Sequence, residues 1–268
     1  MSWWKMFLGM LLMNDRETLV EKRRDDYGTL RITENREGYR FLYFGEQTEQ
    51  SCIFMADPAW LEYDYTRAML LGAFWCRPEP QMTLLGLGGG ALANCLVRHF
   101  APAGVRVVEL RGEVLALAHE KLGLSADPRL QVDIGCAEDH IAAAPASCDL
   151  LCVDLYMEGG LSRLQLQADF FAACQRALRP GGVLVINQWQ MGETGLPYAA
   201  AMLDELFGEN YLQVQVEEGN IILFVPAAGD PPLTLDRPAM NAWAAALEPS
   251  LGYSLTPYIR DLYRAGDH

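Results

Sequence analysis

The chain has 268 residues, enough for one large domain or for one domain with a small appendage. Hydrophobic residues make up 51% of it and charged residues 21%, so it can bury a sizeable core. Its formal net charge of -14 repels phosphate backbones and anionic lipid head groups. Nucleic acids and membrane surfaces are therefore poor partners, whereas a cationic small molecule such as an amine is compatible with the charge.

Cysteine and histidine usage narrows the class further. The 7 cysteines are an odd number scattered through apolar runs, without a Cys-x-x-Cys pair. This favours a reducing, cytoplasmic location over a disulfide framework. The 4 histidines are isolated and none shares a ligand-like spacing with a cysteine, so we predict no structural metal.

Residues 1–26 are assigned to an N-terminal apolar docking segment. Its apolar run, residues 3–13, is far below the roughly 20 residues needed to span a bilayer. The run has one positive charge and no small-x-small cleavage pattern, so we predict neither a membrane span nor a signal peptide. We expect it to dock on the body or on another subunit, with a weak interfacial anchor as the alternative. Together with the aromatic run 39–44, it predicts a homodimer.

Residues 27–77 are predicted to form a small antiparallel sheet and a connecting helix. Aromatic and β-branched residues alternate between turn residues from Tyr27 to Phe54, which indicates about three strands. Asp57-Pro58 then opens a helix whose body runs over 60–75. The prolines in Arg77-Pro78-Glu79-Pro80 mark the boundary with the next domain.

Residues 78–228 change to short apolar strands that alternate with amphipathic helices. This pattern indicates an α/β domain with a parallel, Rossmann-like sheet covered on both faces. The expected strands are 82–85, 105–110, 130–134, 150–154 and 183–187, and the expected helices are 91–100, 114–122, 168–178 and 198–207. The runs 212–216 and 221–225 flank a turn and predict an antiparallel closing hairpin. A C-terminal helical extension, 229–268, contains a helix over 237–247.

A glycine loop carries the strongest chemical signal. Gly86, Gly88 and Gly90 follow a strand and open a helix, where backbone N–H groups can approach a ligand closely. Glu109 ends the next strand 23 residues after Gly86, where a carboxylate can accept hydrogen bonds from both hydroxyls of a ribose. NAD and S-adenosylmethionine both present such a ribose. The compact triple glycine and Asp154 at the end of the fourth strand favour S-adenosylmethionine.

The order of several motifs resembles that of spermidine synthases over roughly residues 27–225. The motifs are Gln50-Ser51, Asp57-Pro58, Tyr65-Thr66-Arg67-Ala68-Met69, Gly86-Leu87-Gly88-Gly89-Gly90, Val108-Glu109, Asp127-Pro128-Arg129, residues 149–154 and Leu178-Arg179-Pro180-Gly181-Gly182. The chain thus resembles the spermidine synthase-like branch of the class I methyltransferase fold, with an N-terminal antiparallel sheet before the glycine loop.

The resemblance implies a transferase that binds S-adenosylmethionine or its decarboxylated form. It implies cofactor contacts from Gly86, Gly88, Gly90, Glu109, Gln50, Cys136 and Ala137. Tyr65 and Asp154 would bracket an attacking amine, and the Asp154 carboxylate would take its proton. The expected reaction moves an aminopropyl or methyl group to a small amine-type acceptor.

Three positions depart from the spermidine synthase pattern. Met157 stands where a second aspartate follows Asp154, Cys136 where an aspartate meets the adenine, and Arg111 where a second acid follows the ribose-binding one. Glu158, Glu62 and Asp64 are candidates to replace the missing charge, although exposed positions are the simpler explanation for them. Two alternatives follow: a catalytically inactive cofactor-binding protein of the same fold and, on the glycine pattern alone, an NAD-dependent oxidoreductase.

Overall fold

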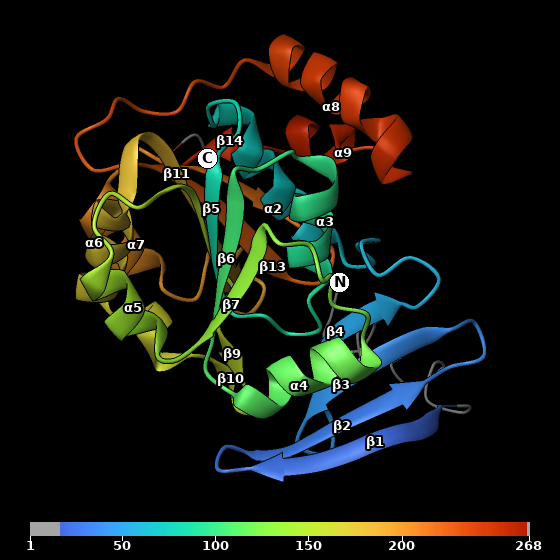
Figure 1. Cartoon of the computed structure of the whole chain (residues 1–268). Coiled ribbons are helices and arrows are strands. Elements are labelled where there is room, and N and C mark those ends of the chain that lie inside the picture. Colours follow the sequence, from blue (N-terminus) through green and yellow to red (C-terminus); the bar gives the residue numbers. More distant parts are fainter. Residues whose placement is uncertain (1–16, 267–268) are drawn as a thin grey trace.

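Two sheets stand side by side in the computed structural model, which describes residues 17–266 (Figure 1). The smaller sheet is antiparallel with strand order β1-β2-β3-β4. The larger sheet has the order β14-β12-β13-β11-β8-β5-β6-β7. A short two-stranded ribbon, β9 (Tyr156–Met157) and β10 (Gly160–Leu161), lies beside the small sheet.

The small sheet has four strands rather than the predicted three. They are β1 (Thr18–Asp25), β2 (Gly28–Glu34), β3 (Tyr39–Phe44) and β4 (Thr48–Phe54). The first strand begins inside the segment assigned to docking, and sequence analysis missed it because its alternation is largely polar. The remainder of that segment, residues 1–16, lies outside the described residues. The apolar face of the sheet is fully buried through residues such as Leu30, Ile32, Leu42 and Ile53.

The connection between the sheets is shorter and tighter than the predicted helix over 60–75. An α-helix, α2 (Asp64–Met69), runs directly into a 3-10 helix, η2 (Leu70–Trp75). The helix begins at Asp64 rather than at residue 60, because residues 57–60 form a turn in which the Trp60 N–H donates to the Asp57 carbonyl oxygen. The second half tightens where Gly72 meets the sheet, since a Cβ atom at this position would collide with the side chain of Val185.

The large sheet confirms the predicted α/β architecture. Its parallel strands are β5 (Gln81–Leu85), β6 (Gly104–Glu109), β7 (Leu130–Ile134), β8 (Cys148–Val153) and β11 (Leu178–Trp189). The antiparallel strands β12 (Leu212–Gln215) and β13 (Asn220–Pro226) form the predicted hairpin, and β14 (Tyr263–Arg264) extends it. The predicted turn at 179–182 lies inside β11, where it forms an irregularity in the pairing with β8.

Helices cover both faces of this sheet (Figure 1). One face carries α3 (Ala91–His99), α8 (Arg237–Leu251) and α9 (Thr256–Arg260), and the other carries α5 (Ala137–Ala143), α6 (Ala168–Ala177) and α7 (Ala200–Phe207). Helix α7 was expected to begin at residue 198 and begins two residues later, at Ala200. Helices α5 and α9 and strand β14 were not predicted, because each is short and lacks a long apolar period.

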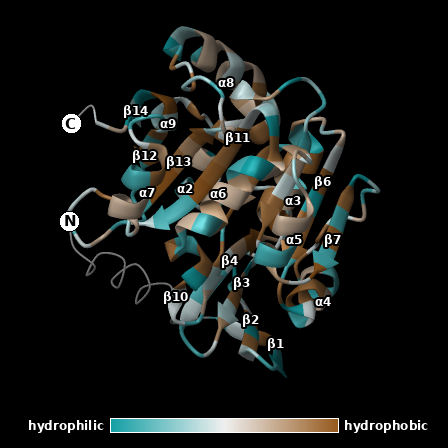
Figure 2. Cartoon of the chain, turned by 90° about the vertical axis from the view of Figure 1, so that its left-hand side faces the viewer, coloured by the Kyte–Doolittle hydropathy of each residue, from teal (hydrophilic) through white to brown (hydrophobic). Residues whose placement is uncertain are grey.

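Alternate residues of β8 belong to two separate cores. Leu150 and Cys152 pack into one cluster, and Leu151 and Val153 pack into the other. The first cluster also contains Leu30 and other residues of the small sheet, so the two sheets share a single core on that side. In Figure 2 the strands of the interior are coloured as hydrophobic, and the outer helical surfaces are more mixed.

A buried ion pair joins the small sheet to the large one. Arg111 is 3% exposed and lies just before α4 (Gly112–Lys121). Its guanidinium donates to both carboxylate oxygens of Asp25, at 2.9 and 2.8 Å, and to the Gly28 carbonyl oxygen, and it stacks 4.5 Å from the Phe44 ring. Burial raises the pKa of Asp25, but the Arg111 bonds and other hydrogen bonds outweigh this and leave the pKa below its ordinary value.

Loss of the Asp25 carboxylate should destabilise the chain markedly. Asp25→Ala leaves the buried Arg111 guanidinium without its counter-charge, so we expect the free energy of unfolding to fall by about 3 kcal/mol. Denaturant unfolding measures the change. Asp26→Ala removes the adjacent exposed carboxylate and serves as the matched control, with an expected change below about 0.5 kcal/mol. Equal effects of the two substitutions would contradict the role of the ion pair.

Candidate active site

The glycine loop turns from β5 into α3 and presses against the end of β8. Gly86, Gly88 and Gly90 all have positive φ, at 100°, 53° and 88°, and Gly90 is the N-cap of α3. A Cβ atom at Gly86 would collide with the backbone carbonyl oxygen of Asp154, so only glycine permits this approach. The loop therefore offers the bare backbone that an adenosyl cofactor requires, and it holds Asp154 beside it.

Glu109 lies at the carboxyl end of β6 and is 6% exposed. Its carboxylate accepts the backbone N–H of Leu87 at 3.0 Å and that of Arg111 at 2.8 Å. Burial raises its pKa, and these two bonds oppose the rise. A carboxylate has about four lone-pair sites, so Glu109 can hold the loop in place and still accept from a ribose hydroxyl. Its role toward a ribose remains a prediction.

Strand β4 lies along the other side of the loop. Ser51 accepts the N–H of Gly89 through its hydroxyl oxygen at 2.8 Å. Gln50, the preceding residue, is partly buried on the same strand. The small sheet thus packs against the glycine loop through Ser51, and the role of Gln50 toward a cofactor remains a prediction.

Cys136 and Ala137 lie at the carboxyl end of β7, next to the end of β6. Cys136 is the N-cap of α5, and Ala137 is 6% exposed. The link to Glu109 is direct, since the Gly135 N–H donates to the Glu109 carbonyl oxygen at 2.9 Å. The structure therefore brings both residues to the same sheet edge as the glycine loop.

Asp154 follows β8 at that edge and is oriented by two asparagines. Its Oδ1 atom accepts from Asn187 Nδ2 at 2.8 Å, and Asn187 Oδ1 accepts in turn from Asn220 Nδ2 at 2.8 Å. Burial raises the pKa of Asp154 to about 6, although the bond from Asn187 opposes the rise. Sequence analysis missed both asparagines; Asn187 at the carboxyl end of an apolar run was the available signal.

Tyr65, on α2, lies near Asp154, whose charge acts on the Tyr65 pKa. Its ring stacks on Tyr63 with a centroid distance of 5.7 Å. Burial raises its pKa well above the ordinary value, and the negative charges of Asp154 and Glu218 raise it further. Tyr156 adds a second aromatic ring and donates from its hydroxyl to the Asn187 carbonyl oxygen at 3.2 Å. The predicted pair Tyr65 and Asp154 is therefore brought together, in acidic and aromatic surroundings.

The proposed substitutes for the missing second aspartate are engaged elsewhere. Met157 is half-buried on β9, and the side chain of the next residue, Glu158, packs against Gly45 of the small sheet. The two acids near α2 also have partners: Glu62 accepts from Trp60 Nε1 at 2.9 Å, and Asp64 accepts from the Tyr258 hydroxyl at 2.6 Å. Glu62 and Asp64 therefore already have hydrogen-bond donors, and the Glu158 side chain lies against the small sheet.

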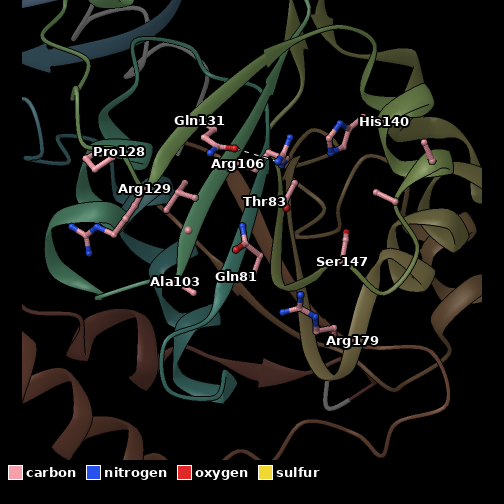
Figure 3. Close-up of a pocket in the computed structure, with 14 residues that line it drawn as sticks. Gln81, Thr83, Ala103, Arg106, Pro128, Arg129, Gln131, His140, Ser147 and Arg179 are labelled. Atoms are coloured by element: carbon pink, nitrogen blue, oxygen red, sulfur yellow. Dashed lines mark hydrogen bonds between the residues drawn. The ribbon is translucent and has the colours of Figure 1, made fainter.

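A pocket of about 680 Å³ opens at the opposite edge of the large sheet (Figure 3). It is lined by the amino ends of β5 and β6 and by Arg106, Arg129 and Arg179. Each arginine pairs with an aspartate, at distances of 2.5 to 3.0 Å. The carboxyl ends of the strands, where Asp154 and the glycine loop lie, are therefore the better candidate site.

Comparison with known proteins identifies the relatives of this arrangement. A family model described as a methyltransferase domain matches residues 84–186. The polyamine aminopropyltransferase of Chromobacterium violaceum is 26% identical over 229 residues, which cover 83% of this chain and 85% of that one. A probable spermidine synthase from Corynebacterium glutamicum has the same fold, with a TM-score of 0.66, 22% identity and coverage of 85% and 86% of the two chains. A spermidine synthase solved with the transition state analogue AdoDATO gives a TM-score of 0.63, at 16% identity over 80% of this chain and 75% of that one.

The chain thus has the fold of the S-adenosylmethionine-dependent methyltransferases and is similar to polyamine aminopropyltransferases and spermidine synthases. The resemblance stated from the motifs is thereby confirmed, including the N-terminal antiparallel sheet. No helix within residues 17–266 has the length and hydropathy needed to cross a bilayer. In the same part of the chain, no three His, Cys, Asp or Glu side chains gather in a way that could hold a metal ion.

Glu109 provides a test of the cofactor site. Glu109→Ala removes the acceptor predicted for the ribose and one anchor of the loop, so we expect binding of S-adenosylmethionine or methylthioadenosine to weaken by about 1–3 kcal/mol. Calorimetry measures the affinity, and circular dichroism checks that the fold is intact. Glu113→Ala, on the exposed side of α4, is the control and should leave the affinity unchanged. An unaltered affinity of Glu109→Ala would remove Glu109 from the site.

Proposed function

We propose that the chain is a transferase that binds S-adenosylmethionine or its decarboxylated form and transfers an aminopropyl or methyl group to a small amine. One observation carries the proposal: the Asp154 backbone touches the glycine loop, while its buried carboxylate is held by Asn187 and lies near enough to Tyr65 for its charge to raise the Tyr65 pKa. The carboxylate is therefore at the junction between a cofactor cradle and an aromatic, acidic surface. The names of two relatives support an amine as the acceptor: the Chromobacterium violaceum protein is called a polyamine aminopropyltransferase, and the Corynebacterium glutamicum protein a probable spermidine synthase.

The residues of the cradle fit an adenosyl group. Gly86 and Gly88 leave backbone free of Cβ atoms, the N-terminus of α3 follows, and Glu109 keeps unused lone pairs. When bound, the cofactor supplies a sulfonium whose neighbouring carbon is open to attack by a nucleophile. Glu109 would hold the ribose, and Gln50, Cys136 and Ala137 would line the rest of the adenosyl site.

Asp154 would prepare the acceptor. An amine is mostly protonated near neutral pH and cannot attack until it loses a proton. The Asp154 carboxylate, with its Oδ1 atom fixed by Asn187, accepts this proton. The free nitrogen would then displace the thioether, forming its bond to the carbon as the carbon–sulfur bond breaks. Tyr65 packs against the alkyl part of the amine and helps to hold it in line.

The homodimer and the cytoplasmic location remain predictions. The first rests on the apolar N-terminal run and the second on the 7 cysteines, all of them unpaired.

Replacement of the base tests the proposed transfer directly. The wild-type chain should transfer an aminopropyl or methyl group to at least one amine in a broad panel. Asp154→Asn keeps the acceptor for Asn187 but cannot take a proton, so turnover should fall about 100- to 10,000-fold. Cofactor affinity and melting temperature should change little.

The control for this experiment is Asp169→Asn, an exposed carboxylate at the start of α6. It should match the wild type in rate. If Asp154→Asn loses thermal stability without a specific loss of rate, Asp154 is structural. If the wild type binds the cofactor but transfers to no amine, the chain is a cofactor-binding protein of this fold without turnover.

The pKa of Asp154 predicts the pH dependence of the reaction. Because the pKa is raised to about 6, the group is a protonated acid below that pH and a competent base above it. The value of kcat/KM should therefore rise with pH and level off above about pH 7. Tyr65 and Tyr156 face Asp154 and stay neutral throughout, since burial raises both of their pKa values. A rate profile from about pH 5 to about pH 8 that is flat in the wild type would contradict this role.

A further inference from the structure

Glu218 presents an unsatisfied carboxylate oxygen at the candidate acceptor site. The residue lies in the turn between β12 and β13, and its Oε1 atom accepts the Asp64 N–H at 2.7 Å. Its Oε2 atom is shielded from solvent, and no donor among residues 17–266 reaches it. Burial raises the pKa of Glu218. A buried charged oxygen without a partner is costly, which indicates a place where a ligand supplies the missing donor.

Two chains of contacts place this turn beside Asp154. Asn220, two residues after Glu218, donates to Asn187, which donates to Asp154. Glu218 also holds the backbone of Asp64, and the ring of the next residue, Tyr65, meets the charges of both Glu218 and Asp154. An amine that packs on Tyr65 would therefore have a carboxylate near each end.

Glu49 on β4 is a competing carboxylate, since its charge also acts on Tyr65. Its Oε1 atom accepts from the Tyr63 hydroxyl, and its Oε2 atom lies 3.4 Å from the Tyr43 hydroxyl, which it shares with Glu17. Burial and the neighbouring charge of Glu17 raise the pKa of Glu49 to about 7. Glu49 already has a donor in the Tyr63 hydroxyl, whereas Oε2 of Glu218 has none among residues 17–266, which makes Glu49 the weaker partner for a cation.

We propose that Glu218 determines acceptor specificity by binding the second ammonium group of a diamine through its Oε2 atom. This inference rests on the proposed function, in which Asp154 takes the proton from the attacking nitrogen. Glu218 reaches the acceptor from the hairpin turn, and it supplies the negative charge that Met157 on β9 cannot supply. An ammonium donor bound by a buried carboxylate forms a charge-assisted hydrogen bond, which is stronger than a neutral one.

A pair of amines that differ in one charge tests the proposal. Glu218→Gln keeps an acceptor for the Asp64 N–H but removes the charge that meets the second ammonium. We expect kcat/KM with diaminobutane to fall about 10- to 100-fold, through a higher KM, whereas kcat/KM with butylamine changes less than about 3-fold. Glu217→Gln, an exposed carboxylate in the same turn, is the matched control and should leave both values unchanged.

A loss of equal size for the two amines, or no loss, would overturn the role of Glu218. A binding measurement separates this outcome from a failure of the proposed transfer. With methylthioadenosine at saturation, calorimetry should show that the wild type binds diaminobutane more tightly than butylamine and that Glu218→Gln removes the difference. If this holds while no amine is turned over, the transferase proposal fails and the diamine site stands. If the wild type has no preference for diaminobutane, the diamine site is refuted.

Discussion

The carboxylate of Glu109 is the point on which the arrangement of the site depends. It binds the backbone N–H of Leu87 in the glycine loop and that of Arg111 at the start of α4. Arg111 in turn carries the buried ion pair with Asp25. One series of charge-assisted hydrogen bonds therefore runs from the loop, through the end of β6, to the first strand of the small sheet. Position 111 carries a second acid in the spermidine synthase pattern, whereas in this chain its arginine joins the two sheets.

A second polar series organises the other half of the site. Asp154, Asn187 and Asn220 connect the ends of β8 and β11 with the start of β13. These strands are far apart in the chain but adjacent in the sheet. The two asparagines are 1% and 7% exposed, so water cannot replace their bonds and the network has one stable arrangement. The rigid placement of Asp154 follows from this network and from the contact with Gly86.

The features that the sequence predicts depend on residues close together in the chain, whereas the features that were missed depend mostly on partners far apart in it. The strands of the large sheet, the glycine loop and Asp154 were identified because apolar runs and glycines act locally. Strand β1 was missed because its alternation is largely polar. The pairing of Arg111 with Asp25 joins residues 86 positions apart, and the bond from Asp64 to Glu218 joins residues 154 apart. No local pattern in a single sequence reports such partners, so Arg111 resembled a departure from the family and Glu218 an ordinary turn residue.

The contact between Gly86 and Asp154 lies where two groups of strands with different proposed roles meet. The predicted cofactor-binding residues lie chiefly at the carboxyl ends of β5, β6 and β7, while the proposed acceptor side is made by β8, β11 and the β12–β13 hairpin, and the two halves meet at this contact. On the proposed function, changes in the hairpin turn would alter which nucleophile is accepted without disturbing the cradle. Such a scaffold allows acceptor chemistry to diversify during evolution while the adenosyl site is preserved, and redesign of the chain for new acceptors would begin at residues 217–219.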